Sequence, residues 1–572
     1  MTNVRIEHLP FDRHHVSSWA ARGRRHRDWP VVYTLNDKQQ VYVGETLAAA
    51  GRLRQHLDAG TKTHLDHARV IIDQSFNKSA CLDLEAFLIR LFAGEGQLEV
   101  LNANVGVANS NYYRREDYRQ SFREIFDLLR DEGLFATSIE QIQNSDLFKL
   151  SPFKSLTAEQ SEAVASIVQS LLADLTGSSG GTSVVEGDPG TGKTVVAVFL
   201  MKMLRDIGAW DGRPLESESL LEGLFTLENA SRLAGLRIGL VVPQQSLRSS
   251  IRAVFRNTPG LDRDMVLSPF DVGQSDEPWD LLIVDEAHRL GQRSNQTSAV
   301  RNRDFVDINV KIFGQDSPAH TQLDWIKQMS HHQLLLVDVR QRVKPGDLSV
   351  ASLTAELDAA RTTGRLHRLR SQMRVSAGGD YVSYVRSVLS DAPPATTLDF
   401  GQYDVRFYDD VEQMLVAVKA RNREHGLARV LAGYAWEWKS KRDRTRVDIA
   451  FGDIQLRWNT TIVDWVDSPR SVDEVGSIHT IQGYDLNYAG VIIGRDLRLD
   501  PVTNSLRFDR NHYFDKKGKQ NNPGQRLSDD DLLEYVANIY SVLLTRGIRG
   551  TYLYVVDEHL REYMRGYFTP SD

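Results

Sequence analysis

Residues 187–194 read Gly187-Asp188-Pro189-Gly190-Thr191-Gly192-Lys193-Thr194. A strand-like apolar run at 183–186 precedes this stretch, and a helical pattern at 195–200 follows it. A strand, a glycine-rich loop and a helix in this order form the context in which a P-loop binds a polyphosphate. The glycines allow backbone N–H groups to turn toward the phosphates, and the new helix adds the positive end of its dipole. All eight residues are therefore predicted to bind a nucleotide.

The chemistry of such a loop depends on two of its side chains and on a later strand. We expect Lys193 to contact the β- and γ-phosphates and the Thr194 hydroxyl to hold Mg²⁺. The apolar run 279–284 ends in Asp285 and Glu286, and parallel α/β sheets place ligands at the carboxyl ends of their strands. Asp285 is predicted to hold Mg²⁺, and Glu286 to orient or deprotonate the attacking water. The predicted cofactors are ATP and Mg²⁺.

Composition limits the class of protein. The chain has 572 residues, 41% of them hydrophobic and 25% charged, which is typical of a globular protein with several compact units. We find no 18-residue apolar run and no signal peptide, so we expect a cytoplasmic location and no membrane contact. The single cysteine, Cys81, excludes an internal disulfide framework and a cysteine-rich zinc site. The net charge of −7 excludes a uniformly basic protein and leaves room for a local basic face.

The first part of the chain shows a different pattern. Strand patterns at 31–35 and 41–44 flank a polar turn and predict a hairpin. Helical patterns follow at 48–57 and 83–92. We predict a small α+β domain over residues 1–115.

The side chains on these elements resemble the signature of the GIY-YIG nuclease family. That signature has a tyrosine on each hairpin strand, an arginine in the next helix, a glutamate in a later helix and a late asparagine. The matching residues here are Tyr33, Tyr42, Arg52, Glu85 and Asn102, with His56 at a frequent accessory position. The first motif departs from the family, because Val31-Val32 stands where the family has Gly-Ile.

The resemblance implies Mg²⁺-dependent cleavage of a phosphodiester bond. Glu85, which we place in the first turn of its helix, would bind one Mg²⁺. Arg52 would neutralise charge on the phosphate in the transition state. Tyr33 or Tyr42, together with His56, would help to remove a proton from the attacking water.

Residues 156–556 resemble the superfamily 1-like DNA/RNA helicase domain that is also found in group III Schlafen proteins. The resemblance depends on the P-loop in combination with three later stretches: Asp285-Glu286-Ala287-His288, residues 479–485 and residues 543–547. It implies two RecA-like parallel-sheet lobes, so the predicted fold class is α/β. The predicted domains are a GIY-YIG-like domain at 1–115, a helical connector at 116–152, lobe 1 at 153–345 and lobe 2 at 346–572.

The helicase resemblance also implies nucleotide contacts from residues spread along both lobes. We expect Gln160 at the adenine edge and Asp338 and Gln341 at the γ-phosphate. From the second lobe, the expected contacts are Arg374, Gly483, and Arg546 as the arginine finger, with Arg549 in reserve.

Together these patterns predict an ATP-dependent nuclease–helicase that acts on nucleic acid, with DNA favoured over RNA. A motor joined to a nuclease suggests antiphage defence or DNA repair, on domain association alone. The alternative is a nucleic-acid-stimulated ATPase, translocase or RNA-directed sensor whose nuclease domain is inactive. The residues identify no protein partner.

Overall fold

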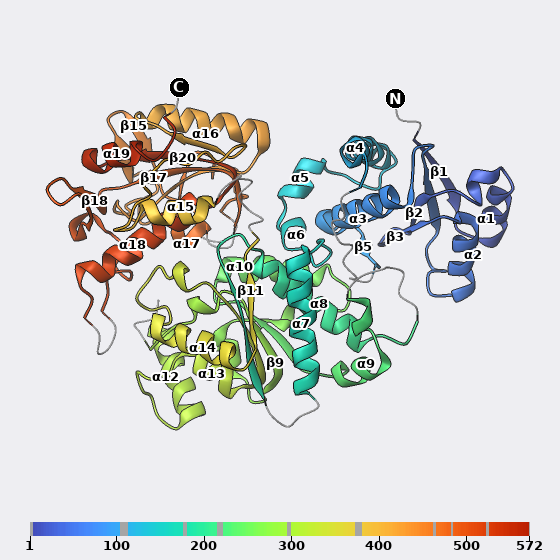
Figure 1. Cartoon of the computed structure of the whole chain (residues 1–572), viewed down its shortest axis with the longest axis horizontal. Helices are drawn as coiled ribbons and strands as arrows, with labels where there is room; N and C mark the ends of the chain where they lie inside the picture. Colours follow the sequence, from blue (N-terminus) through green and yellow to red (C-terminus); the bar gives the residue numbers. More distant parts are fainter. Residues whose placement is uncertain are drawn as a thin grey trace. The chain divides into compact units, whose positions relative to one another are not determined.

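The computed structural model describes residues 4–102, 112–175, 180–213, 221–293, 299–371, 380–461, 465–481, 484–521 and 526–570. The chain forms two compact units (Figure 1). The first comprises Met1–Ser178, Val195–Leu236 and Ser250–Met265, and the second comprises Ser179–Thr194, Arg237–Ser249 and Val266–Asp572. Among the described residues, no helix has the length and apolar character needed to cross a membrane. Arg374 and Gly483 lie outside the described residues.

The first unit contains a five-stranded mixed sheet with strand order β1-β4-β2-β3-β5. Neighbouring strands are antiparallel except β3 and β5, which are parallel. The predicted hairpin is confirmed as β2 and β3, which pair Tyr33 with Gly44. The strands are β1 (Arg5–Pro10), β2 (Val31–Asn36), β3 (Gln40–Thr46), β4 (His67–Ile72) and β5 (Glu99–Val100).

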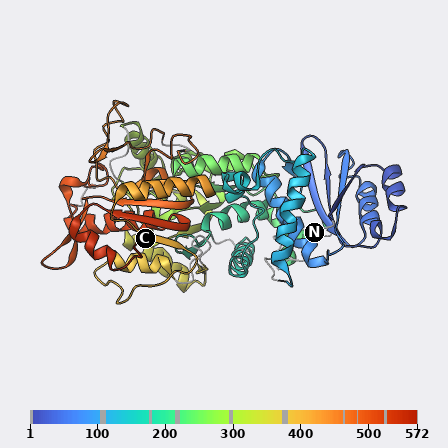
Figure 2. The same cartoon turned by 90° about the horizontal axis from the view of Figure 1, so that it is seen from above.

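Both faces of this sheet are covered, so its strands are apolar on both sides. Tyr33 and Tyr42 pack toward α1 (Arg13–Ala20) and α2 (Ala49–Ala59). Val32 and Val43 point to the opposite face and pack toward α3 (Lys78–Glu95) and α4 (Arg115–Asp131). This alternation follows from the two-residue period of a strand. The same layering, with helices on either side of the sheet, can be followed in Figures 1 and 2.

One prediction for this unit needs correction. The helix that carries Glu85 begins at Lys78, because the side chain of Asn77 caps it, so Glu85 lies in the body of the helix and not in its first turn. In the segment predicted as a connector, Phe122 and Phe126 of α4 pack in the same core as the sheet. The helices are η1 (Arg24–His26), α1 (Arg13–Ala20), α2 (Ala49–Ala59), α3 (Lys78–Glu95), α4 (Arg115–Asp131), α5 (Ile139–Asn144), α6 (Asp146–Lys149), α7 (Ala158–Asp174), η2 (Glu222–Leu224), α9 (Leu227–Leu233) and η3 (Arg263–Met265).

The second unit contains two parallel sheets, as predicted for the α/β class. The first has strand order β11-β6-β10-β9-β7-β8, with every pair parallel. It extends past the predicted boundary at 345, because β11 pairs with β6 and closes one edge. Its strands are β6 (Gly181–Gly187), β7 (Ile238–Val241), β8 (Val266–Leu267), β9 (Trp279–Val284), β10 (Ser330–Val337) and β11 (Leu366–Leu369). The helices of this segment that lie in the second unit are α11 (Pro269–Gln274), η4 (Ala287–Arg289), α12 (Ala299–Phe313), α13 (Gln322–Gln328), η5 (Val339–Gln341) and α14 (Val350–Thr362). The residues of α8 (Lys193–Gly208) and α10 (Gln245–Arg256) are divided between the two units.

The second sheet has strand order β12-β20-β17-β13-β16 and is also parallel throughout. Its strands are β12 (Asp404–Phe407), β13 (Ala428–Ala432), β16 (Val475–Ser477), β17 (Leu486–Ile493) and β20 (Gly547–Val555). The same segment contains two separate two-stranded sheets: β14 (Ile449–Phe451) with β15 (Ile454–Leu456), and β18 (Leu497–Asp500) with β19 (Ser505–Phe508). The helices are α15 (Tyr381–Val388), α16 (Val411–His425), α17 (Ile478–Ile481), η6 (Arg510–His512), α18 (Asp529–Leu544) and α19 (Glu558–Arg565).

Candidate functional sites

The P-loop connects β6 to α8 as a tight turn. Gly190 and Gly192 have φ angles of 85° and 82°, which a residue with a Cβ adopts only with strain. The Lys193 ammonium donates to the carbonyl oxygens of Gly187 at 2.6 Å and Asp188 at 3.1 Å. Its charge therefore lies inside the turn, where a polyphosphate would be held.

Thr194 and Asp285 provide a site that fits Mg²⁺. The Thr194 hydroxyl donates to Oδ2 of Asp285 at 2.8 Å. Oδ1 of Asp285 is buried and has no hydrogen-bond partner among the described residues. Burial and the neighbouring Glu286 charge raise the pKa of Asp285. A buried carboxylate oxygen without a donor is costly, and a hard cation that prefers oxygen ligands would satisfy it.

Glu286 is held in a strained conformation at the end of β9. Its φ of 51° lies in the left-handed region, which is rare outside glycine and clusters at functional sites. Burial opposes its ionisation, but the neighbouring side chains of His288 and Lys193 outweigh this effect and hold the pKa of Glu286 below its usual range. Glu286 is therefore a carboxylate at neutral pH.

His288 connects Glu286 to the next strand. Its Nε2 lies 2.9 Å from a Glu286 carboxylate oxygen, and its Nδ1 accepts from the backbone N–H of Asp338 at 3.2 Å. Because Nδ1 accepts, the ring proton is on Nε2, facing Glu286. The Asp338 carboxylate accepts from the Gln341 amide at 2.9 Å. The structure thus brings together Asp338 and Gln341, which the sequence predicted as a pair.

Arg386 is a residue that the sequence analysis missed. It lies on α15, and its guanidinium pairs with the P-loop residue Asp188 and lies 3.4 Å from Oδ2 of Asp338. Its side chain is only 14% exposed. No local motif marks this arginine, because both partners lie far away in the sequence.

The remaining predicted nucleotide contacts are placed as follows. Arg546 is buried at the end of α18 and donates to the carbonyl oxygen of Tyr484, within the 479–485 stretch, at 3.4 Å. Arg549 is exposed, and its charge is one of the influences that lower the pKa of Glu424. Gln160 is buried in a capping box, where its Oε1 accepts from the Thr157 backbone N–H at 3.0 Å. This cap gives Gln160 a structural function at the start of α7.

In the first unit, three predicted residues form a compact aromatic cluster. The Tyr33 hydroxyl lies 2.8 Å from His56 Nε2, and the Tyr42 ring lies 5.3 Å from the His56 ring. A Cβ on Gly44 would lie 2.5 Å from the Tyr33 hydroxyl, so the glycine after Val43 is needed to seat the Tyr33 ring. Tyr33 is 0% exposed and Tyr42 is 5% exposed. Both tyrosines are therefore buried in this structure.

Lys62, another residue that the sequence analysis missed, lies over this cluster. Its Nζ is 3.2 Å from the centre of the Tyr42 ring and 3.4 Å from His56 Nδ1. Burial and the charge of Arg52 lower the pKa of Lys62 to about 7. Burial, Lys62 and Arg52 lower the pKa of His56 to about 3, so the imidazole is neutral. Lys62 follows α2 in a polar segment that gives no sequence signal for a site.

Glu85 lies with two charged neighbours on the α3 side of the sheet. Burial and the Glu45 charge raise the pKa of Glu85 to about 8, and Lys78 and Arg52 act in the opposite direction. Glu45 pairs with Lys78, while its buried Oε2 has no hydrogen-bond partner among the described residues. Two carboxylates with an unsatisfied oxygen fit a divalent cation. Sequence reasoning missed Glu45, which directly follows Gly44 on β3.

Arg52 and Asn102 complete the predicted nuclease residues. The Arg52 guanidinium donates to Gln55 Oε1 at 2.5 Å, and its charge acts on Glu85, His56 and Lys62. It therefore links the aromatic cluster to the carboxylates. Asn102 is buried and bonds to both the N–H and the C=O of Val43, so it fixes the backbone of β3.

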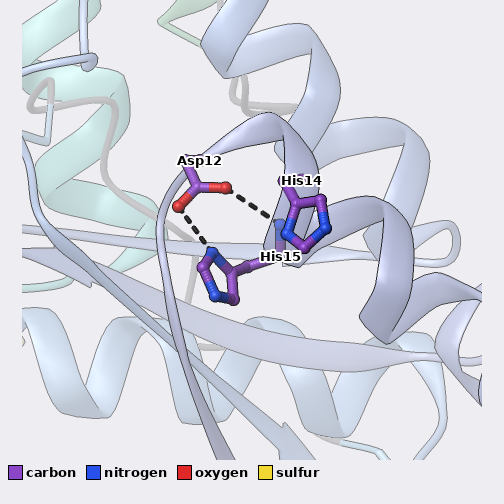
Figure 3. Close-up of side chains that lie close together, drawn as sticks. All are labelled: Asp12, His14 and His15. Carbon is purple, nitrogen blue, oxygen red and sulfur yellow. Dashed lines mark hydrogen bonds and ion pairs between the residues drawn. The ribbon is translucent and has the colours of Figure 1, made fainter.

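A separate group of Asp12, His14 and His15 lies at the start of α1 (Figure 3). All three side chains are exposed, and one oxygen of Asp12 accepts from the His15 backbone N–H at 2.9 Å while the other lies 2.6 Å from His15 Nδ1. Both carboxylate oxygens are thus used by a helix cap, and adjacent helical side chains point in different directions. We interpret the group as an N-cap.

Comparison with known proteins gives a family match for most of the second unit. Residues 181–557 match the Schlafen group 3 DNA/RNA helicase domain. An uncharacterized protein of Saccharomyces cerevisiae is 25% identical over 395 residues, which cover 66% of this chain and 82% of the yeast protein.

Three solved helicase structures also align with the chain. An arterivirus helicase, nonstructural protein 10, is 13% identical with a TM-score of 0.25, over 69% of this chain and 61% of the viral chain. A Bacteroides Pif1 helicase, solved with ADP-AlF3 and ssDNA, is 11% identical with a TM-score of 0.23, over 71% and 98%. The Pif1 helicase of Candida albicans is 10% identical with a TM-score of 0.27, over 70% and 96%.

Proposed function

Because the chain belongs to the Schlafen group 3 DNA/RNA helicase family, a class of ATP-dependent nucleic-acid motors, we propose that it is an ATP-dependent nuclease–helicase. In this proposal, the two parallel-sheet lobes hydrolyse ATP and move along nucleic acid, with DNA as the preferred substrate. The domain over residues 1–115 cuts a phosphodiester bond. A function in antiphage defence or DNA repair follows from this combination of activities.

The observation that carries the motor function is the connected set of side chains beside the P-loop. Mg²⁺, held by Thr194 and Asp285, would neutralise phosphate charge. Glu286 is an ionised carboxylate in a buried position, and it orients and deprotonates the attacking water. His288 couples the position of Glu286 to that of Asp338, and Asp338 senses the γ-phosphate together with Gln341.

Residues of the second lobe complete the ATP site in this proposal. Arg546 acts as the arginine finger and neutralises the developing charge on the γ-phosphate. Arg386, which pairs with Asp188 and Asp338, balances two carboxylates that would otherwise repel the triphosphate. The cycle of ATP binding and hydrolysis then alternately favours closed and open arrangements of the two lobes.

The nuclease function is supported by the arrangement around Arg52. Mg²⁺, held by Glu85 with Glu45 beside it, would stabilise charge on the scissile phosphate. Arg52 contributes a positive charge next to these carboxylates and neutralises the same phosphate. The buried Tyr33, Tyr42 and His56 lie toward the opposite face of the hairpin, and the Arg52 charge couples His56 to these carboxylates.

The test is cleavage of circular single- and double-stranded DNA with Mg²⁺, in the presence and absence of ATP. The proteins compared are the wild type, Glu85→Ala, Lys193→Ala and a control, Glu162→Ala, at an exposed position on α7. We expect Glu85→Ala to abolish cutting and the control to retain it. Dependence on Lys193 would show that the motor gates cleavage.

Cutting by Glu85→Ala at the wild-type rate would contradict the nuclease assignment. If no DNA is cut while DNA-stimulated ATPase activity is intact, the same assay with single-stranded RNA distinguishes an RNA-directed enzyme from a motor with an inactive nuclease domain.

A further inference from the structure

Two loops of the second lobe meet at the carboxyl end of β13. The first comprises residues 434–446, directly after β13, and the second comprises residues 513–519, between η6 and α18. The backbone N–H of Phe514 donates to the carbonyl oxygen of Tyr434 at 2.8 Å. Lys519 Nζ donates to the carbonyl oxygen of Tyr513 at 2.6 Å, which fixes the shape of the second loop. We call the surface that these residues form the two-loop surface.

Aromatic side chains gather where the two loops meet. The Tyr434 ring lies 6.2 Å from the Trp438 ring and 5.6 Å from the ring of His479 on α17. His479 Nε2 in turn lies 3.3 Å from Oδ2 of Asp515, on the second loop. Phe514 is 39% exposed, although phenylalanine is among the residues most often buried in folded proteins. An exposed ring that is anchored beside other aromatic side chains offers a face on which a planar group can stack.

The same two loops carry a concentration of positive charge. They contain eight lysine and arginine residues and three acidic residues, in a chain whose net charge is −7. Lys441 Nζ lies 5.2 Å from the centre of the Trp438 ring, so a cation lies next to the aromatic group. A local excess of positive charge on an acidic protein indicates an anionic partner. The exposed cations are Lys441, Arg442, Arg444, Arg446, Lys516 and Lys517.

Rings and cations on one surface match the two parts of a single strand of nucleic acid. Unpaired bases have flat faces that stack on aromatic side chains, whereas the bases inside a duplex already stack on one another. The phosphates of the strand are negatively charged and pair with lysine and arginine. An acidic protein segment would match the charges but would give the exposed Phe514 ring no planar group to stack on.

We propose that the two-loop surface, together with His479, binds single-stranded nucleic acid, with a base stacked on Phe514 and phosphates at Lys516 and the neighbouring cations. This inference rests on the motor function proposed above and assigns it a strand-binding surface on the second lobe. Every base has a flat face, so we expect little dependence on sequence.

The two-loop surface is connected to α18, the helix that precedes Arg546. The Tyr540 hydroxyl of α18 donates to Oδ1 of Asp496 at 2.5 Å. A Cβ on Gly433, the residue before Tyr434, would lie 2.6 Å from the same hydroxyl, so the first loop begins in contact with α18. We therefore expect a strand bound at the two-loop surface to stimulate ATP hydrolysis through the helix that leads to the arginine finger.

The first test measures the affinity of the full chain for fluorescent single strands in the absence of ATP. The probes are oligothymidylate, oligouridylate and an abasic sugar–phosphate strand of the same length. We expect Phe514→Ala to weaken binding of the base-bearing strands by about tenfold and to leave binding of the abasic strand unchanged, because that strand has no base to stack. A loss confined to one of the two base-bearing strands identifies DNA or RNA as the strand that this surface takes.

Two further variants control this comparison. Phe514→Tyr keeps an aromatic ring, so we expect it to bind all three probes like the wild type. Val502→Ala truncates a side chain that is 90% exposed in the turn between β18 and β19 of the same lobe, and it should also bind like the wild type. Thermal melting of the three variants checks that the fold is kept.

The second test measures the charge of the surface. Lys516→Glu should weaken binding of all three probes, because each of them carries phosphates. It should also reduce the slope of log affinity against log salt concentration by about 0.7 for each phosphate contact that is lost. Arg423→Glu, at an exposed position on α16, makes the same charge change away from the two loops and should leave binding unchanged.

The third measurement links binding to the motor. In Phe514→Ala and Lys516→Glu, we expect the concentration of oligothymidylate that half-maximally stimulates ATP hydrolysis to rise by the same factor as the dissociation constant. A rise in the dissociation constant without a matching rise in this concentration would overturn the connection through α18.

The possible results separate this inference from the function on which it rests. Equal weakening of all three probes by Phe514→Ala would overturn stacking on this ring. Affinities that neither Phe514→Ala nor Lys516→Glu changes, in a protein whose ATP hydrolysis is still stimulated by a single strand, would overturn the inference and leave the motor function in place. A wild type that binds no single strand would contradict the motor function and the inference with it.

Discussion

The nucleotide site and the nuclease centre differ in how the fold assembles them. In the nucleotide site, Thr194, Asp285 and Asp338 follow three neighbouring parallel strands, β6, β9 and β10. The carboxyl ends of such strands share one edge, so the side chains meet there. In the nuclease centre, the aromatic cluster and the carboxylates lie toward opposite faces of the β2–β3 hairpin, and Arg52 couples them electrostatically.

This difference determines how the loss of one side chain affects the other side chains of the same site. In the nucleotide site, each group is linked to the next by a contact, from Glu286 through His288 to Asp338 and Arg386. In the nuclease centre, the aromatic cluster and the carboxylates are linked through the electrostatic effect of Arg52 on both groups. We expect the effects of two substitutions on activity to be coupled in the nucleotide site and closer to additive in the nuclease centre.

The largest effect is expected for Glu286→Gln. This change removes the ionised carboxylate that prepares the attacking water, so we expect ATP turnover to fall by about 10²- to 10⁴-fold while ATP binding is retained. Steady-state hydrolysis and equilibrium nucleotide binding check the two parts. Cleavage without ATP should be unaffected, and its loss would mean that the two sites are not separable.

A smaller effect is expected for Arg386→Met. The change leaves Asp188 and Asp338 without their shared cation beside the triphosphate, so we expect the KM for ATP to rise about tenfold, which corresponds to about 1.4 kcal/mol. Arg361→Met, which removes an exposed ion pair on α14, is the matched control. An unchanged KM would contradict this prediction, because it would show that Arg386 does not influence the binding of ATP.

Gly44→Ala tests the packing of the aromatic cluster. The new Cβ would lie 2.5 Å from the Tyr33 hydroxyl, so we expect a loss of about 1–3 kcal/mol in the free energy of unfolding. Gly51→Ala in α2 meets no neighbouring atom and should be neutral or stabilising. Denaturant unfolding of both variants measures the difference, and equal stabilities would contradict the close contact at Gly44.

The smallest effect is a pH dependence of stability caused by His56. Burial and two nearby cations lower the pKa of His56 to about 3, so the folded protein keeps it neutral while the unfolded chain takes up a proton below pH 6.5. The stability that this group contributes is complete above pH 6.5 and is lost as the pH falls toward 3. We expect the wild type to lose about 0.8 kcal/mol at pH 6 relative to His56→Gln. Parallel pH curves for the two proteins would be inconsistent with a buried neutral imidazole.

The sequence predicted most of the fold and the groups that lie in contiguous motifs. The P-loop, the Asp285-Glu286 pair and the β2–β3 hairpin follow from local pattern and spacing. Arg386 and Lys62 could not be found this way, because their importance comes from contacts with residues that are distant in the sequence or on other elements. The start of α3 was missed because the Asn77 cap precedes a turn without clear periodicity.

The sequence also could not show that the tyrosines are buried. The alternation of side chains along β2 and β3 predicts that Tyr33 and Tyr42 share one face of the hairpin. That face is covered by α2 and by Lys62, in the segment after α2, and no local pattern predicts this packing. The strand β11, which lies beyond the expected boundary at 345, could not be placed for a similar reason. A short strand such as β11 is assigned to a sheet by its pairing partner, here β6, and not by its own sequence.

The measurement that tests the central claim most directly is steady-state ATP hydrolysis with and without single-stranded DNA, in the wild type and in Lys193→Ala. The account predicts turnover that DNA stimulates in the wild type, and its loss in Lys193→Ala, because the Lys193 charge inside the P-loop is removed. Substantial turnover by Lys193→Ala, or wild-type turnover that neither DNA nor RNA changes, would contradict a nucleic-acid motor centred on this loop.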